Sequence, residues 1–145
     1  MKTAVFNILG DISGSIFVDL FAGTGQMGIE AEKRGAQVIF VEKNKNLAKI
    51  IKTKARGRVI TCDAVKALKS LKYKPNIIFA DPPYSFTEYQ NLIKESLSKL
   101  DENGLFILEH HKNLWFDAPK RRKYGDTVLS IWRKDDEKGS ISRNL

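Results

Sequence analysis

A short turn, Asp81-Pro82-Pro83-Tyr84, holds the residue types best suited to chemistry in this sequence. It follows the apolar run 76–80, so we expect it at the end of a buried strand. Two consecutive prolines stiffen the backbone and remove two N–H donors, which leaves carbonyl oxygens facing outward. The Asp81 carboxylate and the Pro82 carbonyl can hold the hydrogens of a nucleobase amine, while Tyr84 stacks on the ring. A plain proline-terminated strand is the simpler interpretation of the turn alone.

A glycine-rich loop indicates which cofactor is bound. Gly23, Gly25 and Gly28 have the spacing G-x-G-x-x-G, and Glu42 closes the next expected strand about 20 residues further on. This pattern alone favours a nicotinamide cofactor. Asp19 argues against it, because a carboxylate just before the loop repels a pyrophosphate and attracts an ammonium group. S-adenosylmethionine carries that ammonium and no phosphate, so we favour it as the cofactor.

Four acidic residues fall at the C-terminal ends of expected strands: Asp19, Glu42, Asp63 and Asp81. Ligands bind at this edge of open parallel sheets, so we expect the four to line one crevice. Glu42 can accept hydrogen bonds from ribose hydroxyls, and Asp63 from the adenine amine. Each acid taken singly fits a helix cap or a turn equally well.

Alternating apolar and amphipathic segments predict the elements that position these residues. We expect strands at 16–21, 37–42, 58–61, 76–80 and 105–109, helix ends or helices at 1–9, 26–34, 45–54, 64–70 and 87–100, and an antiparallel pair at 120–124 and 127–133. The alternation indicates an α/β fold, with a mostly parallel sheet covered by helices on both faces. The 145 residues suit one domain, 1–134, followed by a flexible polar tail, 135–145.

The chain is basic, with 25 Lys and Arg against 17 acidic residues and a net charge of +8. Such an excess indicates a polyanionic partner. The run Lys120-Arg121-Arg122-Lys123 has no acid at helical spacing, which favours contact with phosphates. Two further groups of cations, within 43–58 and 66–74, fit solvated helix faces equally well.

Several classes of protein are disfavoured. Cys62 is the single cysteine, and the two histidines, His110 and His111, lack a recognisable set of partner ligands, so we expect no disulfide and no metal site. No apolar segment approaches the roughly 18 residues of a membrane helix, and the N-terminus lacks a signal-peptide layout. We therefore expect a cytoplasmic protein without a membrane partner.

The motifs taken in order resemble the bacterial 16S ribosomal RNA guanine-N2 methyltransferase family. The segments that carry the resemblance are Phe6-Asn7-Ile8-Leu9, 18–25, Val41-Glu42, Asp63-Ala64, 81–84, Glu109-His110 and Lys123-Tyr124-Gly125. They cover about residues 4–133. The resemblance implies a class I, Rossmann-like methyltransferase domain, with a seven-stranded sheet whose last strand is antiparallel. It also implies methyl transfer from S-adenosylmethionine to a guanine amine in 16S RNA.

The resemblance further implies site residues and partners. Asp81, Pro82 and Tyr84 would be catalytic. The cofactor-binding residues would be Asp19, Phe21, Ala22, Gly23, Thr24, Gly25, Glu42, Lys43, Asp63 and Ala64. We expect a monomer that acts on 16S RNA or on the 30S subunit. Family members have a basic β-hairpin ahead of the helix ending in Phe-Asn-Ile-Leu, whereas Met1 begins inside that helix here. We expect either that the start has been assigned too late or that this is a shortened relative.

Other functions stay open on the residues themselves. An adenine-N6 methyltransferase of DNA or RNA is one alternative, because a proline-proline-aromatic turn serves any planar amine. A nonenzymatic module that binds S-adenosylmethionine or RNA is another. A nicotinamide oxidoreductase fits less well, because 145 residues leave little room for a substrate domain.

Overall fold

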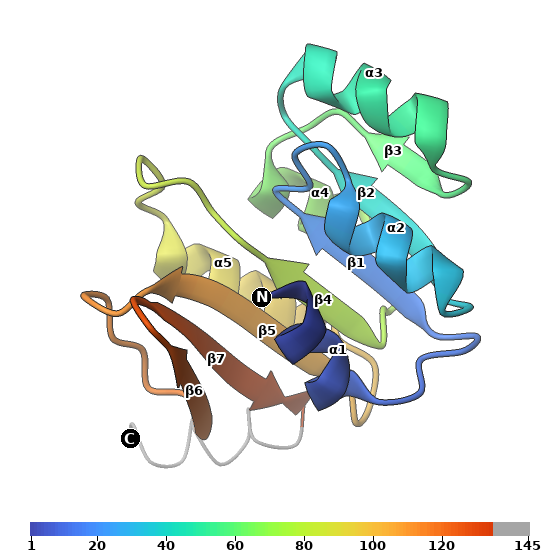
Figure 1. Cartoon of the computed structure of the whole chain (residues 1–145). Coiled ribbons are helices and arrows are strands. Elements are labelled where there is room, and N and C mark those ends of the chain that lie inside the picture. Colours follow the sequence, from blue (N-terminus) through green and yellow to red (C-terminus); the bar gives the residue numbers. More distant parts are fainter. Residues whose placement is uncertain (135–145) are drawn as a thin grey trace.

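The computed structural model describes residues 1–134, and the expected flexible tail, 135–145, lies outside the described residues. One seven-stranded sheet has the strand order β3-β2-β1-β4-β5-β7-β6 (Figure 1). The strands are β1 (Ile16–Leu20), β2 (Gln37–Val41), β3 (Arg58–Ile60), β4 (Ile77–Ala80), β5 (Leu105–His111), β6 (Lys120–Tyr124) and β7 (Thr127–Arg133). The helices are α1 (Lys2–Leu9), α2 (Gln26–Lys33), α3 (Lys45–Lys54), α4 (Ala64–Ser70) and α5 (Tyr89–Lys99).

The direction of the strands confirms the predicted fold class. β1 to β5 run parallel to one another, and β7 is antiparallel to both β5 and β6. The parallel pairs are joined by crossovers that contain helices, which is why both faces of the sheet are covered. The carboxyl ends of β1, β2, β3, β4 and β5 therefore meet at one edge of the sheet, where the connecting loops can build a site.

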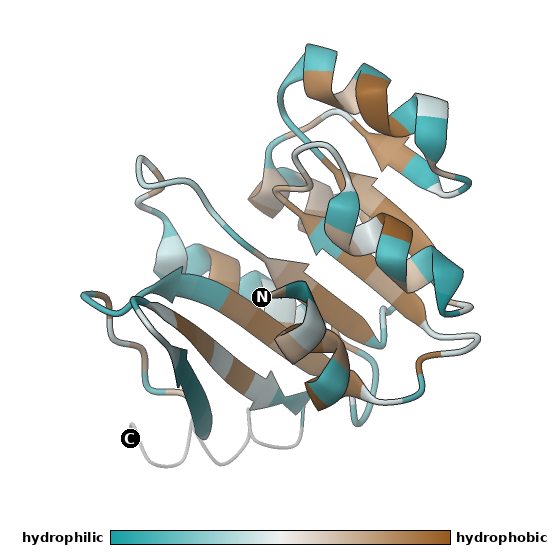
Figure 2. Ribbon diagram, viewed as in Figure 1, coloured by the Kyte–Doolittle hydropathy of each residue, from teal (hydrophilic) through white to brown (hydrophobic). Residues whose placement is uncertain are grey.

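Two apolar layers hold the sheet between its helices. One layer packs α4 and α5 on one face, and the other packs α1, α2 and α3 on the opposite face. Neighbouring residues of β1 divide between them, since Phe17 belongs to the α1 side and Val18 to the α4 side, and both are fully buried. Apolar residues consequently run continuously along the central strands, whereas the helices are polar on their outer surfaces (Figure 2).

Two predicted boundaries differ from the structure in ways that shape the site. The first strand ends at Leu20 rather than Phe21, because Phe21 adopts a left-handed backbone with φ of 58° and turns the chain out of the sheet. β5 continues to His111, two residues beyond the predicted end at Glu109. It does so because β7 pairs with it along its whole length, up to His111 opposite Thr127.

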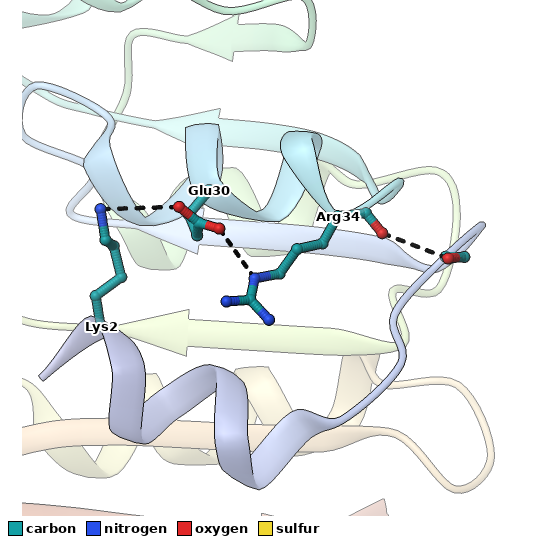
Figure 3. A network of polar contacts seen from close by, with 4 residues as sticks. Lys2, Glu30 and Arg34 are labelled. Atoms are coloured by element: carbon teal, nitrogen blue, oxygen red, sulfur yellow. Dashed lines mark hydrogen bonds and ion pairs between the residues drawn. The ribbon is translucent and has the colours of Figure 1, made fainter.

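α1 is attached to α2 by polar contacts and to the sheet by apolar ones. Glu30 lies between the Lys2 ammonium, at 3.9 Å, and the Arg34 Nε, at 3.0 Å (Figure 3). The Arg34 guanidinium also lies 4.6 Å from the centre of the Phe6 ring. Partly exposed ion pairs contribute about 0–1 kcal/mol, so the buried Phe6 side chain contributes most of the attachment. Within residues 1–134, no helix is long and apolar enough to cross a membrane.

Gly28 is the glycine at which α2 packs closely on β2. A Cβ atom at this position would overlap Cε2 of Phe40, whose ring is fully buried. We expect Gly28→Ala to lower the free energy of unfolding by about 1–3 kcal/mol, measured by urea denaturation. In an uncrowded helix the same change is stabilising by about 1 kcal/mol. The control is Phe40→Leu, which makes room for the added methyl group, so the double variant should lose less unfolding free energy than the two single variants together. Additive losses, or a Gly28→Ala variant more stable than the wild type, would contradict the predicted clash.

Candidate active site

Two cavities open at the carboxyl edge of the sheet and meet at the Asp81-Pro82-Pro83-Tyr84 turn. The cofactor cavity, of about 460 Å³, extends over the ends of β1, β2 and β3, and the base cavity, of about 760 Å³, extends over the ends of β4 and β5. Both are lined by Asp81, Pro83 and Phe86. A ligand in one cavity is therefore next to a ligand in the other, with Asp81 at the junction.

Glu42, which lines the cofactor cavity, fixes the glycine loop after β1. Its Oε1 accepts a hydrogen bond from the Gly23 N–H at 2.7 Å, and its Oε2 accepts one from the Asn44 N–H at 2.8 Å. These contacts arise because Glu42 follows β2 and Gly23 follows the adjacent β1. A carboxylate oxygen can accept more than one hydrogen bond, so Glu42, which lines the cavity, retains acceptors for ribose hydroxyls.

The far end of the cofactor cavity suits a purine. Asp63 caps α4 through a hydrogen bond from the Lys66 N–H at 3.2 Å, and it lines the cavity together with Lys43 and Ala64. Phe21 and Leu47 add apolar surface. Asp63 thus places an acceptor beside apolar walls, which is the combination that an adenine ring and its amine require.

The charge of this cavity distinguishes between the two candidate cofactors. Its lining contains the carboxylates of Glu42, Asp63, Asp81 and Glu88 but only one cation, Lys43. A pyrophosphate would be repelled by this set, whereas a positively charged cofactor with ribose hydroxyls and an amine finds acceptors for each group. The residues present therefore fit S-adenosylmethionine.

The glycine loop and Asp19 lie outside the lining of this cavity. Ala22, Gly23 and Thr24 form the turn after β1, and Gly25, with φ of 87°, is the N-cap of α2. Asp19 is 1% exposed, and its carboxylate accepts a hydrogen bond from the Gly28 N–H at 3.0 Å.

Burial, more than the charges of Asp81 and Glu42, raises the pKa of Asp19 to about 7, while the Gly28 hydrogen bond lowers it. The structure therefore brings Glu42, Asp63 and Asp81 into the cofactor cavity and leaves Asp19 buried outside it, where it holds the start of α2 through the Gly28 N–H. A contact between Asp19 and the ammonium of a ligand stays a prediction.

The base cavity presents an aromatic face and two carboxylates. The Tyr84 side chain is 93% exposed, and its ring centre lies 6.3 Å from that of His111. Asp81 borders the cavity, and desolvation by the surrounding atoms raises the pKa of its carboxyl group. An exposed ring beside acceptors is suited to a base that has been extruded from a nucleic acid.

Glu109 is a site residue that the sequence reasoning missed. It lines the base cavity, and burial together with the charge of Asp81 raises its pKa to about 7, while the N-terminal ammonium lowers it. The predicted strand 105–109 already ended on this acid. The strand-end rule that selected Asp19, Glu42, Asp63 and Asp81 would therefore have found it.

His110 belongs to the floor of the base cavity. Its Nε2 lies 2.7 Å from the Ser130 hydroxyl and its Nδ1 lies 2.9 Å from the His111 carbonyl, so both ring nitrogens are engaged. Burial lowers the pKa of His110, which favours the neutral ring. Among residues 1–134, no three His, Cys, Asp or Glu side chains are grouped so that they could hold a metal ion.

A basic surface borders the base cavity. All five residues of β6 are exposed, and the Arg121 guanidinium lies 5.8 Å from the ring centre of Trp115, a residue that is 65% exposed. Lys112, Asn113, Arg121 and Lys123 line a small cavity of about 420 Å³, and Asn113 also lines the base cavity. The predicted phosphate-contacting run thus lies next to the place where a base can bind.

The strand order and the antiparallel β7 are those of the class I methyltransferase fold, and the cavity at the carboxyl edge fits S-adenosylmethionine. The Haemophilus influenzae protein HI0767 has this fold, with a TM-score of 0.78 at 26% identity over 92% of this chain and 95% of that chain. The family described as Conserved hypothetical protein 95 matches residues 1–133, and the chain belongs to this family.

Known proteins agree with this assignment. YlbH of Bacillus subtilis is 30% identical over 155 residues, which cover 92% of this chain and 84% of that protein. Ribosomal RNA small subunit methyltransferase D of Escherichia coli K12 is 33% identical over 112 residues, which cover 72% of this chain and 54% of that enzyme. The Thermus thermophilus 16S rRNA N2 G1207 methyltransferase RsmC, solved with AdoMet and guanosine, has the same fold, with a TM-score of 0.81 at 20% identity over 91% of this chain and 41% of that chain.

Proposed function

We propose that this protein transfers a methyl group from S-adenosylmethionine to the exocyclic N2 amine of a guanine in 16S ribosomal RNA. The observation that carries the proposal is the pair of cavities that meet at Asp81, one suited to the cofactor and the other to a stacked base. The E. coli relative supports the RNA substrate, because its name is ribosomal RNA small subunit methyltransferase D. RsmC supports the pairing of ligands, since its structure holds AdoMet and guanosine.

The proposed cofactor site uses the predicted residues in different ways. Glu42 binds the ribose hydroxyls, and Asp63 accepts a hydrogen bond from the adenine amine. S-adenosylmethionine, when bound, supplies the electrophilic methyl group. The remaining predicted residues shape the loop and the cavity wall: Asp19, Phe21, Ala22, Gly23, Thr24, Gly25, Lys43 and Ala64.

The proposed catalytic residues act by orienting the amine. The lone pair of a guanine N2 is delocalised into the ring, so the nitrogen is a weak nucleophile. The Asp81 carboxylate and the Pro82 carbonyl each accept a hydrogen bond from one N–H of this amine. These contacts let the nitrogen become pyramidal and turn its lone pair toward the cofactor cavity. Tyr84 stacks on the extruded base. The N–CH3 bond would form as the S–CH3 bond of the cofactor breaks, with S-adenosylhomocysteine as the leaving group, and one N–H proton would pass to Asp81. Orientation of the reactants would provide most of the acceleration.

Analysis of the methylated product tests the proposal. The purified protein is incubated with methyl-labelled S-adenosylmethionine and either 30S subunits, free 16S RNA or 50S subunits, and the RNA is digested to nucleosides for mass spectrometry. We expect labelled N2-methylguanosine from 30S subunits or 16S RNA and none from 50S subunits. Labelled N6-methyladenosine would replace the guanine proposal by the adenine one. Absence of label in every RNA, at a cofactor concentration shown to saturate the protein, would contradict the proposed enzyme.

We further propose that the protein acts as a monomer, in the cytoplasm, on 16S RNA or the 30S subunit. The supporting observations are the basic surface beside the base cavity and the rRNA-modifying relative. Light scattering of the protein alone should give the mass of one 16.4 kDa chain.

Charge reversal on β6 is expected to weaken RNA binding more than an equal reversal elsewhere. In Arg121→Glu/Lys123→Glu two cations beside the base cavity become anions, so affinity for 16S RNA should fall at least about tenfold at 0.1 M salt. The slope of log K against log[salt] should shrink by about 2. The matched control, Lys49→Glu/Lys52→Glu on the exposed side of α3, makes the same change in net charge. Equal losses in both variants would mean that only net charge matters.

A further inference from the structure

We propose that Glu109 determines base specificity: its carboxylate accepts a hydrogen bond from the N1–H of guanine, so the base cavity accepts guanine and rejects adenine. This inference rests on the proposed methyl transfer to a base amine, and it adds a residue that reads the identity of that base. Three observations carry it, namely the place of Glu109 in the sheet, the freedom of its carboxylate, and the hydrogen-bond pattern of the two purines.

The register of the sheet brings Glu109 next to Asp81. Leu108 of β5 pairs with Ala80 of β4, and the next residues along these two parallel strands are Glu109 and Asp81. Neighbouring strands lie about 4.8 Å apart, so side chains at these two positions can reach the same small ligand. Both residues line the base cavity with Tyr84, and the charge of Asp81 acts on Glu109. Two carboxylates therefore face the same bound base.

The acids at this edge of the sheet divide into two groups. Asp19, Glu42 and Asp63 each accept a hydrogen bond from a backbone N–H, so they hold loops and helix ends in place. By contrast, within residues 1–134 the carboxylates of Asp81 and Glu109 accept no hydrogen bond and form no ion pair. The two acids left without a partner are the two that line the base cavity. Their acceptors are available for N–H groups of a ligand.

The two purines differ in what they present to such a pair. The Watson–Crick edge of guanine carries N1–H and the N2 amine side by side, so both carboxylates find donors. Adenine presents a lone pair at N1 beside its N6 amine, and that lone pair would face the Glu109 carboxylate. A carboxylate reads donors on a base edge in this way, with a discrimination of roughly 10- to 100-fold for one well-placed contact.

The environment of Glu109 makes this preference depend on pH, because only the charged carboxylate is purely an acceptor, whereas a protonated carboxyl group can donate to the N1 lone pair of adenine. The side chain is half-buried, and burial and the charge of Asp81 raise its pKa to about 7. Few water molecules then compete for its oxygens, so a donor from the base gains more than it would at an exposed carboxylate. Measurements at pH 8 keep Glu109 mainly charged.

A pair of nucleosides tests the N1 contact. Guanosine carries N1–H and a carbonyl oxygen at C6, whereas 2-aminopurine riboside keeps the amine at C2, has a lone pair at N1 and carries hydrogen at C6. The change in their affinity ratio between the wild type and Glu109→Gln reports the N1 contact, because the C6 difference is present for both proteins. NMR titration of the protein saturated with S-adenosylhomocysteine, at pH 8, gives the ratio of the two affinities. We expect the wild-type protein to bind guanosine at least about tenfold more tightly. We expect Glu109→Gln to reduce this ratio or to reverse it, because the Gln amide can donate to the N1 lone pair.

Controls separate this role from a structural one. Glu102→Gln removes the same charge in the exposed turn before β5 and should leave the ratio unchanged. Glu109→Asp keeps the carboxylate, so this variant should still bind guanosine more tightly than 2-aminopurine riboside. If Glu109→Gln has the wild-type ratio, or if the wild type binds both nucleosides equally, the inference is overturned. The product assay on 30S subunits tests the proposed function separately. If the wild type forms N2-methylguanosine but Glu109→Gln keeps the wild-type affinity ratio, only the role of Glu109 is rejected. If the wild type forms no N2-methylguanosine, the proposed function is rejected.

Discussion

Asp81→Ala should lower kcat for methyl transfer by about 10²- to 10⁴-fold while S-adenosylmethionine still binds. Asp81 lies at the junction of the two cavities, where we propose that it orients the amine and receives its proton. Both roles involve the reacting base and not the binding of the cofactor. The cofactor keeps Glu42 and Asp63 as its hydrogen-bond acceptors. Single-turnover kinetics at saturating cofactor measures the chemical step, and isothermal calorimetry measures cofactor affinity.

Two further variants sharpen this prediction. Asp81→Asn keeps one acceptor oxygen and the shape of the side chain but cannot take a proton, so it should retain more activity than Asp81→Ala if orientation dominates. Asp101→Ala removes an exposed aspartate at the opposite edge of the sheet and should behave as the wild type. Loss of cofactor affinity with a normal rate at saturation would contradict the role of Asp81.

Glu42→Ala should have the opposite kinetic signature, with cofactor affinity lost and the chemical step retained. The carboxylate accepts hydrogen bonds from Gly23 and Asn44 at 2.7 and 2.8 Å, and in our proposal it also binds the ribose. Hydrogen bonds to a charged group contribute about 1.5–3 kcal/mol each, so losing the ribose contacts and releasing the loop should weaken S-adenosylmethionine binding by about 10²- to 10³-fold. Calorimetry on the variant and the wild type measures this change.

Control variants test whether the loss of cofactor affinity is specific to Glu42. Glu42→Gln keeps one acceptor and should lose less affinity than Glu42→Ala, and Glu102→Ala in the exposed turn should lose none. Because Glu42 lies outside the lining of the base cavity, kcat at saturating cofactor should stay near the wild-type value. The wild type should not bind NAD, and tight NAD binding would mean that the cavity holds a dinucleotide instead.

The order of the elements followed from the sequence because each one has a strong local signal. Apolar runs bounded by glycine, proline and asparagine predicted the strands, and the capping residues Asn44 and Asp63 mark the starts of α3 and α4. The antiparallel pair around Gly125 and Asp126 was confirmed as β6 and β7. Ends were less well defined, since the length of β5 depends on its pairing with β7, and a local pattern does not contain that information.

For the site, the sequence by itself determined which acids reach the carboxyl edge, because a residue at the end of a parallel strand must lie there whatever the strand order. Only the tertiary structure decided what each acid does. Asp19, one residue before the end of β1, is buried against Gly28, whereas Glu109 and Asp81 are left without partners beside the same cavity. The reason is that the role of a carboxylate depends on which N–H groups come within about 3 Å of it, and distant segments of the chain supply those groups.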